Sequence, residues 1–147
     1  MSDHTTRQEK TLRLWIQIVR LANRLQKDVD TKLRKYHGQS LTRFDVLSQL
    51  ERVPGHRLPV GELSRRLLTS VTNITRLLDR MEADGLLIRK LSDIDRRSFV
   101  VYTTSEGTEL FKEMAIANSE WISQAFESIS EEKMVILESA LHAVSKD

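Results

Sequence analysis

Hydrophobic residues recur at three- and four-residue steps through the first quarter of the chain, which predicts one long helix over residues 10–36. Two stripes run along it: Leu12, Trp15, Ile16, Val19, Ala22, Val29 and Leu33 form the first, and Leu14, Ile18, Leu21 and Leu25 form the second. At about 100° per residue the second stripe lies roughly 60–80° round the helix from the first. Two stripes favour contact with another subunit as well as with the chain's own core. A central helix buried on all sides is the alternative.

Short helices separated by polar breaks are predicted next. "HGQS" at 37–40 ends the long helix, and Thr42 with Asp45 fits a capping box that opens a helix over residues 43–51. "RVPGHRLP" at 52–59 contains both prolines and is therefore expected to be a loop. A short helix over residues 61–68 is expected to follow this loop.

The second half of the chain adds one more helix, a hairpin and two closing helices. Ser70 is the expected N-cap of a helix over 71–84, and Gly85 is expected to take a left-handed conformation after it. "LLIRKL" (86–91) and "SFVVYT" (98–103) predict two strands joined by a charged turn. Helices over 105–129 and 131–144 are predicted with Thr104 and Ser130 as their N-caps.

The helices over 61–68 and 71–84 have the layout of a helix-turn-helix, whose second helix enters the DNA major groove. Side chains that can bond to bases or phosphates gather at the start of that second helix: Ser70, Thr72, Asn73, Thr75 and Arg76. The hairpin that follows resembles a wing, and Arg96 and Arg97 at its tip could contact a minor groove or phosphates. The alternative for the two helices alone is an ordinary helical hairpin.

Two stretches carry a resemblance to a known family. "ELSRRLLTSVTNITRLLDRMEADGLLIRK" and "DIDRRSFVVYTTSEG" are similar to the second helix-turn-helix element and the wing motif of the MarR family of winged-helix transcription regulators. Asp95-Arg96-Arg97 matches that family's "D-x-R" wing motif. Leu68 departs from the pattern, because a turn glycine is common at its position. The resemblance covers residues 10–145 approximately.

The resemblance implies a role for each wing residue and an assembly. Arg97 is expected to enter the minor groove and Arg96 to contact phosphate, while Asp95 is expected to hold the wing by pairing with Arg89. The family is dimeric through its first and last helices, so residues 10–36 and 105–145 are expected to form a homodimer and residues 40–104 the DNA-binding region. Many members release DNA when an aromatic or phenolic effector binds. Trp15 is the one candidate for contact with such an effector, and packing in the core or dimer is its alternative.

Composition and charge narrow the remaining classes. The chain has 147 residues and no cysteine, which excludes disulfides and thiolate metal sites. Net charge is +2, yet residues 101–147 hold three Lys/Arg against nine Asp/Glu, so a polyanion is expected to contact the first hundred residues. The polar N-terminus does not resemble a secretory signal, which makes a cytoplasmic location the expectation.

These observations predict a mainly α fold, a winged helix-turn-helix flanked by dimerisation helices. Four scattered histidines do not form a recognisable metal motif, and no nucleophile–base set is recognisable either, so neither a cofactor nor an enzyme is expected. The predicted function is a dimeric regulator that binds a near-palindromic operator in double-stranded DNA, a repressor released by a small molecule. A winged-helix module that binds another protein and not DNA is the alternative.

Overall fold

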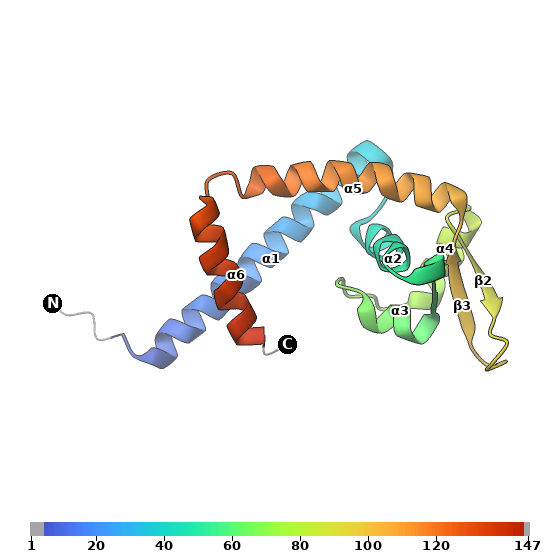
Figure 1. Ribbon diagram of the computed structural model, residues 1–147, viewed down its shortest axis with the longest axis horizontal. Coiled ribbons are helices and arrows are strands. Elements are labelled where there is room, and N and C mark those ends of the chain that lie inside the picture. Colours follow the sequence, from blue (N-terminus) through green and yellow to red (C-terminus); the bar gives the residue numbers. More distant parts are fainter. Residues whose placement is uncertain (1–4, 146–147) are drawn as a thin grey trace.

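The N- and C-terminal helices occupy one side of the molecule, a small winged unit occupies the other, and a long helix runs across the top between them (Figure 1). The computed structural model describes residues 5–145. In chain order its elements are α1 (Arg7–His37), α2 (Leu41–Glu51), a 3-10 turn η1 (Pro54–His56), β1 (Arg57–Pro59), α3 (Val60–Arg66), α4 (Ile74–Ala83), β2 (Leu87–Leu91), β3 (Phe99–Thr103), α5 (Ser105–Ala125) and α6 (Glu131–Ser145). The chain is therefore mainly α, as the sequence predicted.

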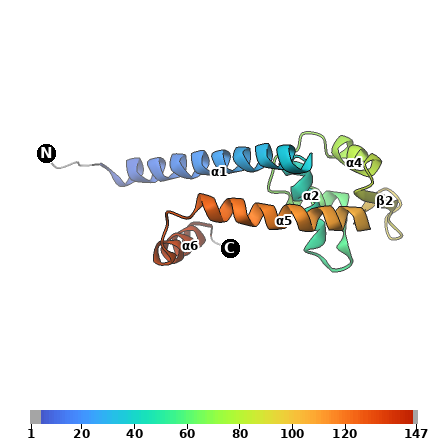
Figure 2. The same ribbon diagram turned by 90° about the horizontal axis from the view of Figure 1, so that it is seen from above.

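Helix α1 begins at Arg7 because a capping box forms there. Glu9 N donates to Thr6 Oγ1 (3.2 Å), and Thr6 N donates to Glu9 Oε2 (2.7 Å). Only Val29 and Leu33 of this helix are buried, so the alternative of a helix buried on all sides is wrong for the single chain. Its first half extends away from the winged unit (Figure 2). The apolar residues exposed there belong to both predicted stripes: Leu12, Leu14, Trp15, Ile16, Ile18, Val19 and Leu21.

Helix α2 starts two residues earlier than predicted. Its N-cap is Ser40, whose Oγ accepts a hydrogen bond from Arg43 N (3.2 Å), so the capping box of Thr42 and Asp45 is wrong. Asp45 instead points into the protein and is only 5% exposed. Serine and threonine both suit an N-cap, so Ser40 and Thr42 were both possible caps. Thr42 was the prediction because Asp45 has the spacing that completes its capping box, but the Asp45 carboxylate has its partners elsewhere.

A loop over residues 52–59 was expected, and this prediction is wrong at its second half. Residues 57–59 form β1, which pairs antiparallel with β3 and gives a three-stranded sheet in the order β1-β3-β2. Leu58 is buried while its two neighbours are exposed, which fixes the strand against the core. Pro59 is tolerated because β1 is an edge strand. The two predicted strands of the hairpin are confirmed to within one residue as β2 and β3.

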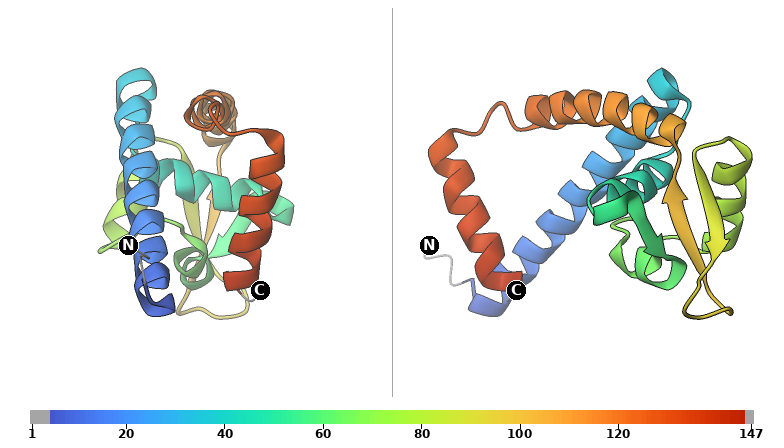
Figure 3. Two further views of the ribbon diagram at one scale, coloured as in Figure 1. Left: turned by 90° about the vertical axis from the view of Figure 1, so that its left-hand side faces the viewer. Right: turned by 45° about the vertical axis from the view of Figure 1, so that its right-hand side comes forward.

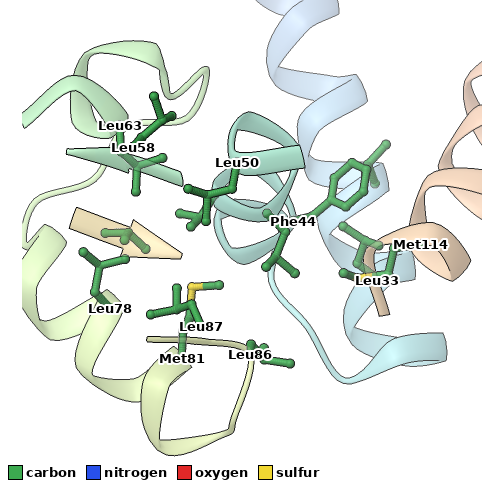
Figure 4. Packing of buried hydrophobic residues seen from close by; sticks show 14 residues of the cluster. Leu33, Phe44, Leu50, Leu58, Leu63, Leu78, Met81, Leu86, Leu87 and Met114 are labelled. Carbon is green, nitrogen blue, oxygen red and sulfur yellow. The ribbon is translucent and has the colours of Figure 1, made fainter. Parts of the chain in front are cut away.

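One hydrophobic core joins the winged unit to the long helices. Leu50 of α2, Leu63 of α3, and Leu78 and Met81 of α4 pack with Leu87 of β2 in its central part (Figure 4). Leu33 of α1, Phe44 of α2 and Met114 of α5 form the end of the core nearest the long helices. The part of the core that positions α4 is therefore continuous with the part that anchors α1 and α5.

The junction between the wing and α5 is tightly packed. Gly85 has the predicted left-handed conformation (φ 78°), and its carbonyl accepts a hydrogen bond from Thr104 Oγ1 (2.6 Å). Thr104 Oγ1 in turn accepts from Gly107 N (3.1 Å), which confirms Thr104 as an N-cap. A Cβ atom on Gly107 would overlap the carbonyl of Leu86, so only glycine fits there. The wing is thus fixed to α5 at its base.

The two closing helices differ from each other in burial. Helix α5 ends at Ala125, four residues before the predicted end, and α6 follows with Ser130 confirmed as its cap through the bond that Lys133 N donates to Ser130 Oγ (3.2 Å). Helix α6 turns back from the end of α5 and crosses α1 in the view of Figure 1, but Figure 2 shows that the two helices are separated. No residue of α6 is buried. Its exposed apolar residues are Met134, Val135, Ile136, Leu137, Leu141 and Val144.

Candidate nucleic-acid interface

The candidate recognition helix is shorter than predicted. Helix α4 begins at Ile74, and its N-cap is Asn73, whose Oδ1 accepts from Arg76 N (3.0 Å), so Ser70 as the N-cap of a helix from 71 is wrong. Ser70 and Thr72 lie in the non-helical segment before α4, while Thr75 and Arg76 lie in its first turn. All five predicted recognition residues are exposed and lie close together in the chain. Capping occupies Asn73 Oδ1, which leaves the Nδ2 group as the donor available to a ligand.

The segment before α4 is held by the buried carboxylate of Asp45. Its Oδ2 accepts hydrogen bonds from Leu68 N (2.7 Å), Thr69 N (2.8 Å) and Thr69 Oγ1 (2.9 Å). Its Oδ1 accepts from Gln49 Nε2 (3.2 Å) on the same helix. Leu68 itself is 75% exposed. A turn glycine is therefore unnecessary at this position, because the Asp45 carboxylate fixes the turn by accepting from the backbone amides of Leu68 and Thr69.

The wing partly neutralises the acidic side of α4. Arg89 on β2 pairs with Asp79 (2.5 Å) and Glu82 (2.9 Å), and its backbone N–H also donates to Glu82 (2.8 Å). The hydrogen bonds from the Arg89 guanidinium hold the pKa of Glu82 below its ordinary value, and the same bond raises the pKa of Arg89. Because the pKa of Glu82 is lowered, this interaction stabilises the fold above the ordinary glutamate pKa. That stabilisation is lost as the pH falls through the folded value.

The wing tip presents two free arginines. Arg96 and Arg97 are exposed, and within residues 5–145 the structure shows no ion pair for either guanidinium. The predicted pair of Asp95 with Arg89 does not form, because Arg89 is engaged by α4. Asp95 instead shapes the turn: its Oδ1 accepts from Arg97 N (3.0 Å), and its carbonyl accepts from Ser98 N (3.0 Å). Arg89 thus joins the wing to α4, and Asp95 holds the turn at the wing tip.

One apolar residue at the tip did not follow from the charge pattern. Ile94 is 99% exposed, which is unusual for a side chain of this type. Ile94 and the two arginines belong to the turn between β2 and β3. The two strands carry this turn away from α5 (Figure 3). In the sequence, the only sign of this exposed apolar residue was its place between two aspartates.

A mostly apolar cavity lies behind the candidate interface. Its volume is about 230 Å³, and it lies between α1, α2, α5 and the turn before α4. The lining residues are Leu25, Gln26, Val29, Leu41, Phe44, Asp45, Ser48, Arg52, Leu68, Thr69, Asn118 and Ile122. Trp15 is not among them, and its side chain lies on the exposed half of α1. Any effector contact by Trp15 would therefore need a surface other than this cavity.

The structure combines a helix-turn-helix, a three-stranded wing, an exposed polar recognition segment and two exposed arginines at the wing tip. These features together define a winged helix-turn-helix protein. Comparison with known proteins makes the assignment narrower. The MarR family model matches residues 37–98. The chain belongs to the MarR family of winged helix-turn-helix transcription regulators. The expectation that it is not an enzyme agrees with this membership.

Among curated relatives, the transcriptional repressor MprA of Escherichia coli is 33% identical over 99 residues, which are 67% of this chain and 56% of MprA. The chain thus spans little more than half the length of that relative. A MarR family regulator from Silicibacter pomeroyi has a solved structure that is 29% identical, with a TM-score of 0.82 over 99% of this chain and 98% of that one.

Two further solved structures share the fold at lower identity. Sco3205 of Streptomyces coelicolor, solved in complex with DNA, is 22% identical with a TM-score of 0.81 over 99% of this chain and 91% of that one. The organohalide-sensing regulator RdhR-CbdbA1625, in its 2,4-dichlorophenol-bound form, is 20% identical with a TM-score of 0.78 over 99% and 84% of the two chains. Among the residues that the structure describes, no helix is both long and apolar enough to cross a membrane.

Proposed function

We propose that this protein is a dimeric transcription regulator that binds a specific, near-palindromic site in double-stranded DNA. The observation that carries the proposal is the pairing of an exposed polar segment at the start of α4 with a wing that presents Arg96 and Arg97. Short hydroxyl and amide side chains let a helix approach base edges, and arginine suits narrow minor grooves. The DNA complex of Sco3205 supports the same partner. Residues 40–104 would form the DNA-binding region.

Removal of the Arg97 side chain tests the proposal. A duplex selected by the protein from a random pool would be titrated with wild type and Arg97→Ala over a range of salt concentrations. We expect Arg97→Ala to weaken binding by on the order of tenfold and to reduce the log–log salt slope by about 1. Its thermal stability should not change, because the side chain is exposed.

Arg20→Ala is the matched control, since it removes the same charge from the polar side of α1. An affinity of Arg97→Ala equal to that of the control would reject the wing contact. If the wild type selects no duplex at all, or its binding does not depend on salt, the regulator proposal fails as a whole. The protein-binding module would then remain.

The exposed apolar residues of α1 and α6 support the dimer. A single subunit leaves both α1 stripes uncovered from Leu12 to Leu21, and it leaves α6 without a buried residue. Contiguous apolar surface of this kind is rare on monomers and marks interaction sites. A second copy of the chain that covers residues 10–36 and 105–145 would place two α4 helices about a two-fold axis. Half-sites about one helical turn of DNA apart would follow.

The cavity behind the turn supports repression that a small effector relieves. Asn118 Oδ1 is buried and, among the described residues, has no hydrogen-bond donor. An apolar cavity with one unused acceptor suits a small aromatic molecule that carries a hydroxyl group, and RdhR-CbdbA1625 binds 2,4-dichlorophenol. Asp45, Leu68 and Thr69 belong both to the lining and to the hydrogen bonds that hold the turn. An occupant that displaces these three residues would also displace the segment from Ser70 to Asn73.

Asn118→Leu tests the effector site with 2,4-dichlorophenol as the probe. The phenol should weaken DNA binding by the wild type, whereas Asn118→Leu should bind DNA normally and respond at least about tenfold less. Such a loss corresponds to one buried hydrogen bond. Asn118→Asp is the matched comparison, because it keeps an acceptor and should respond to the phenol. An equal response of Asn118→Leu and wild type would exclude this cavity as the site.

A further inference from the structure

Helix α4 has two flanks, and only one of them faces the wing. Asp79 and Glu82 lie on the flank that β2 covers, where Arg89 pairs with both of them. Arg76, Arg80 and Asp84 follow each other at four-residue steps and therefore share the other flank. That flank borders an open groove of about 730 Å³, whose far wall is the corner between the end of α1 and the start of α2.

Four arginines line this groove: Arg34 and Arg43 on the corner, and Arg76 and Arg80 on α4. Asp84 is the one acidic residue among the lining residues, and Arg43 Nη1 already donates to its Oδ2 (2.7 Å). Ser40, Thr42, Ser70 and Thr72 add hydroxyl groups to the lining. Guanidinium and hydroxyl groups are the side chains that most often bond to phosphate oxygens in DNA complexes. The groove therefore has the chemistry of a sugar–phosphate binding surface.

The corner is held rigidly in place. Asp30 Oδ1 accepts from Leu41 N (2.8 Å), and its Oδ2 accepts from Arg34 Nε (2.9 Å), so one carboxylate joins α1, Arg34 and the start of α2. Arg43 is fixed by Asp84 and by Gln39, whose Oε1 accepts from Nη1 (3.1 Å). The Arg43 side chain is only 16% exposed, yet it lines the groove. Side chains that are already ordered lose little entropy when they bind.

We propose that this groove binds the DNA backbone on the side of α4 opposite the wing, with Arg34, Arg43 and Arg80 as phosphate-binding residues. The inference rests on the proposed function and extends it. A helix that lies in the major groove has one phosphate strand on each side, and the wing accounts for only one of them. Ser70, Thr72 and Arg76 line the groove as well as the recognition segment, so the two surfaces are continuous.

Arg80→Ala gives the cleanest test, because Arg80 is exposed and alanine is a strong helix former. On the selected duplex we expect affinity to fall several-fold and the log–log salt slope to decrease by about 1, equally for matched and mismatched bases. Arg20→Ala on α1 should leave both unchanged. A neutral methylphosphonate would also replace single phosphates next to each half-site. One such replacement should weaken the wild type and have no further effect on Arg80→Ala.

Three results separate the possible failures. If the wild type selects no duplex, the proposed function fails and the groove proposal falls with it. If the wild type binds but Arg80→Ala keeps the full salt slope and every methylphosphonate affects both proteins equally, only the groove proposal is overturned. If inorganic phosphate at constant ionic strength stabilises the wild type but not Arg80→Ala, while the DNA salt slope is unchanged, the groove binds a free phosphate group instead of DNA.

Discussion

Replacement of Asp45 with alanine is expected to lower the free energy of unfolding by about 3 kcal/mol. The carboxylate is 5% exposed and accepts four hydrogen bonds, two of them from the backbone amides of Leu68 and Thr69. Each amide left without an acceptor in a buried place costs about 1–3 kcal/mol. Urea unfolding followed by circular dichroism measures the change. DNA binding should also weaken, because Ser70 and Thr72 follow directly on the turn that Asp45 holds.

Asp45→Asn is the matched comparison for this experiment. The asparagine keeps the shape and one oxygen that can accept from the two amides, while its NH₂ group can donate to the side-chain oxygen of Gln49. It loses only the strengthening that a charged acceptor provides, so a cost of about 1 kcal/mol is expected. A loss below 1 kcal/mol for Asp45→Ala would show that the turn is stable without its carboxylate. Asp45 would then provide no physical link between an occupant of the cavity and the recognition segment.

Ile18→Asp is expected to convert the proposed dimer to monomers and to weaken binding to the full DNA site by on the order of 100-fold or more. Ile18 is 47% exposed in the single chain and lies in the second stripe of α1. A carboxylate in the middle of an apolar interface would lose its water without a partner, whereas it remains solvated in the monomer. Helix content should persist, because Val29 and Leu33 anchor α1 independently of this position.

Sedimentation velocity and DNA titration measure the two effects of Ile18→Asp. Gln17→Asp is the matched control, since it adds the same charge one residue away, on the polar side of the helix. A single half-site should bind wild type and Ile18→Asp with similar affinity, because one α4 and one wing suffice for it. If Ile18→Asp remained dimeric, the dimer surface would lie elsewhere, for example on the exposed apolar residues of α6.

Much of the fold was predictable because its signals are local. The 3.6-residue periodicity of α1, α4 and α5 and the strand pattern of the hairpin depend on neighbours in the sequence. Thr104, Ser130 and Gly85 were recognisable for the same reason, since a cap or a left-handed turn involves only a few adjacent residues. The five polar residues before and in the first turn of α4 and the two wing arginines are indeed exposed, and their contacts with DNA remain predictions.

Several of the errors arose where a residue has partners on another element. Asp45 looked like half of a capping box, but its partners are Leu68 and Thr69 more than twenty residues away. Arg89 was assigned to Asp95, whereas folding brings it to Asp79 and Glu82 on α4. Strand β1 was missed because a three-residue strand acquires its hydrogen bonds only from β3.

The sequence by itself determined the class of fold, the polar face of the recognition segment and the charged wing, because periodicity, capping and turn chemistry act over a few residues. Only the tertiary structure decided which acid holds which base, where α4 begins, and that a groove with four arginines lies beside it. The groove requires residues 34–43 and 70–84 to lie against each other. Hydrogen bonds and packing between residues so far apart in the chain leave no periodic pattern in the sequence. They can therefore be recognised only once the core has formed.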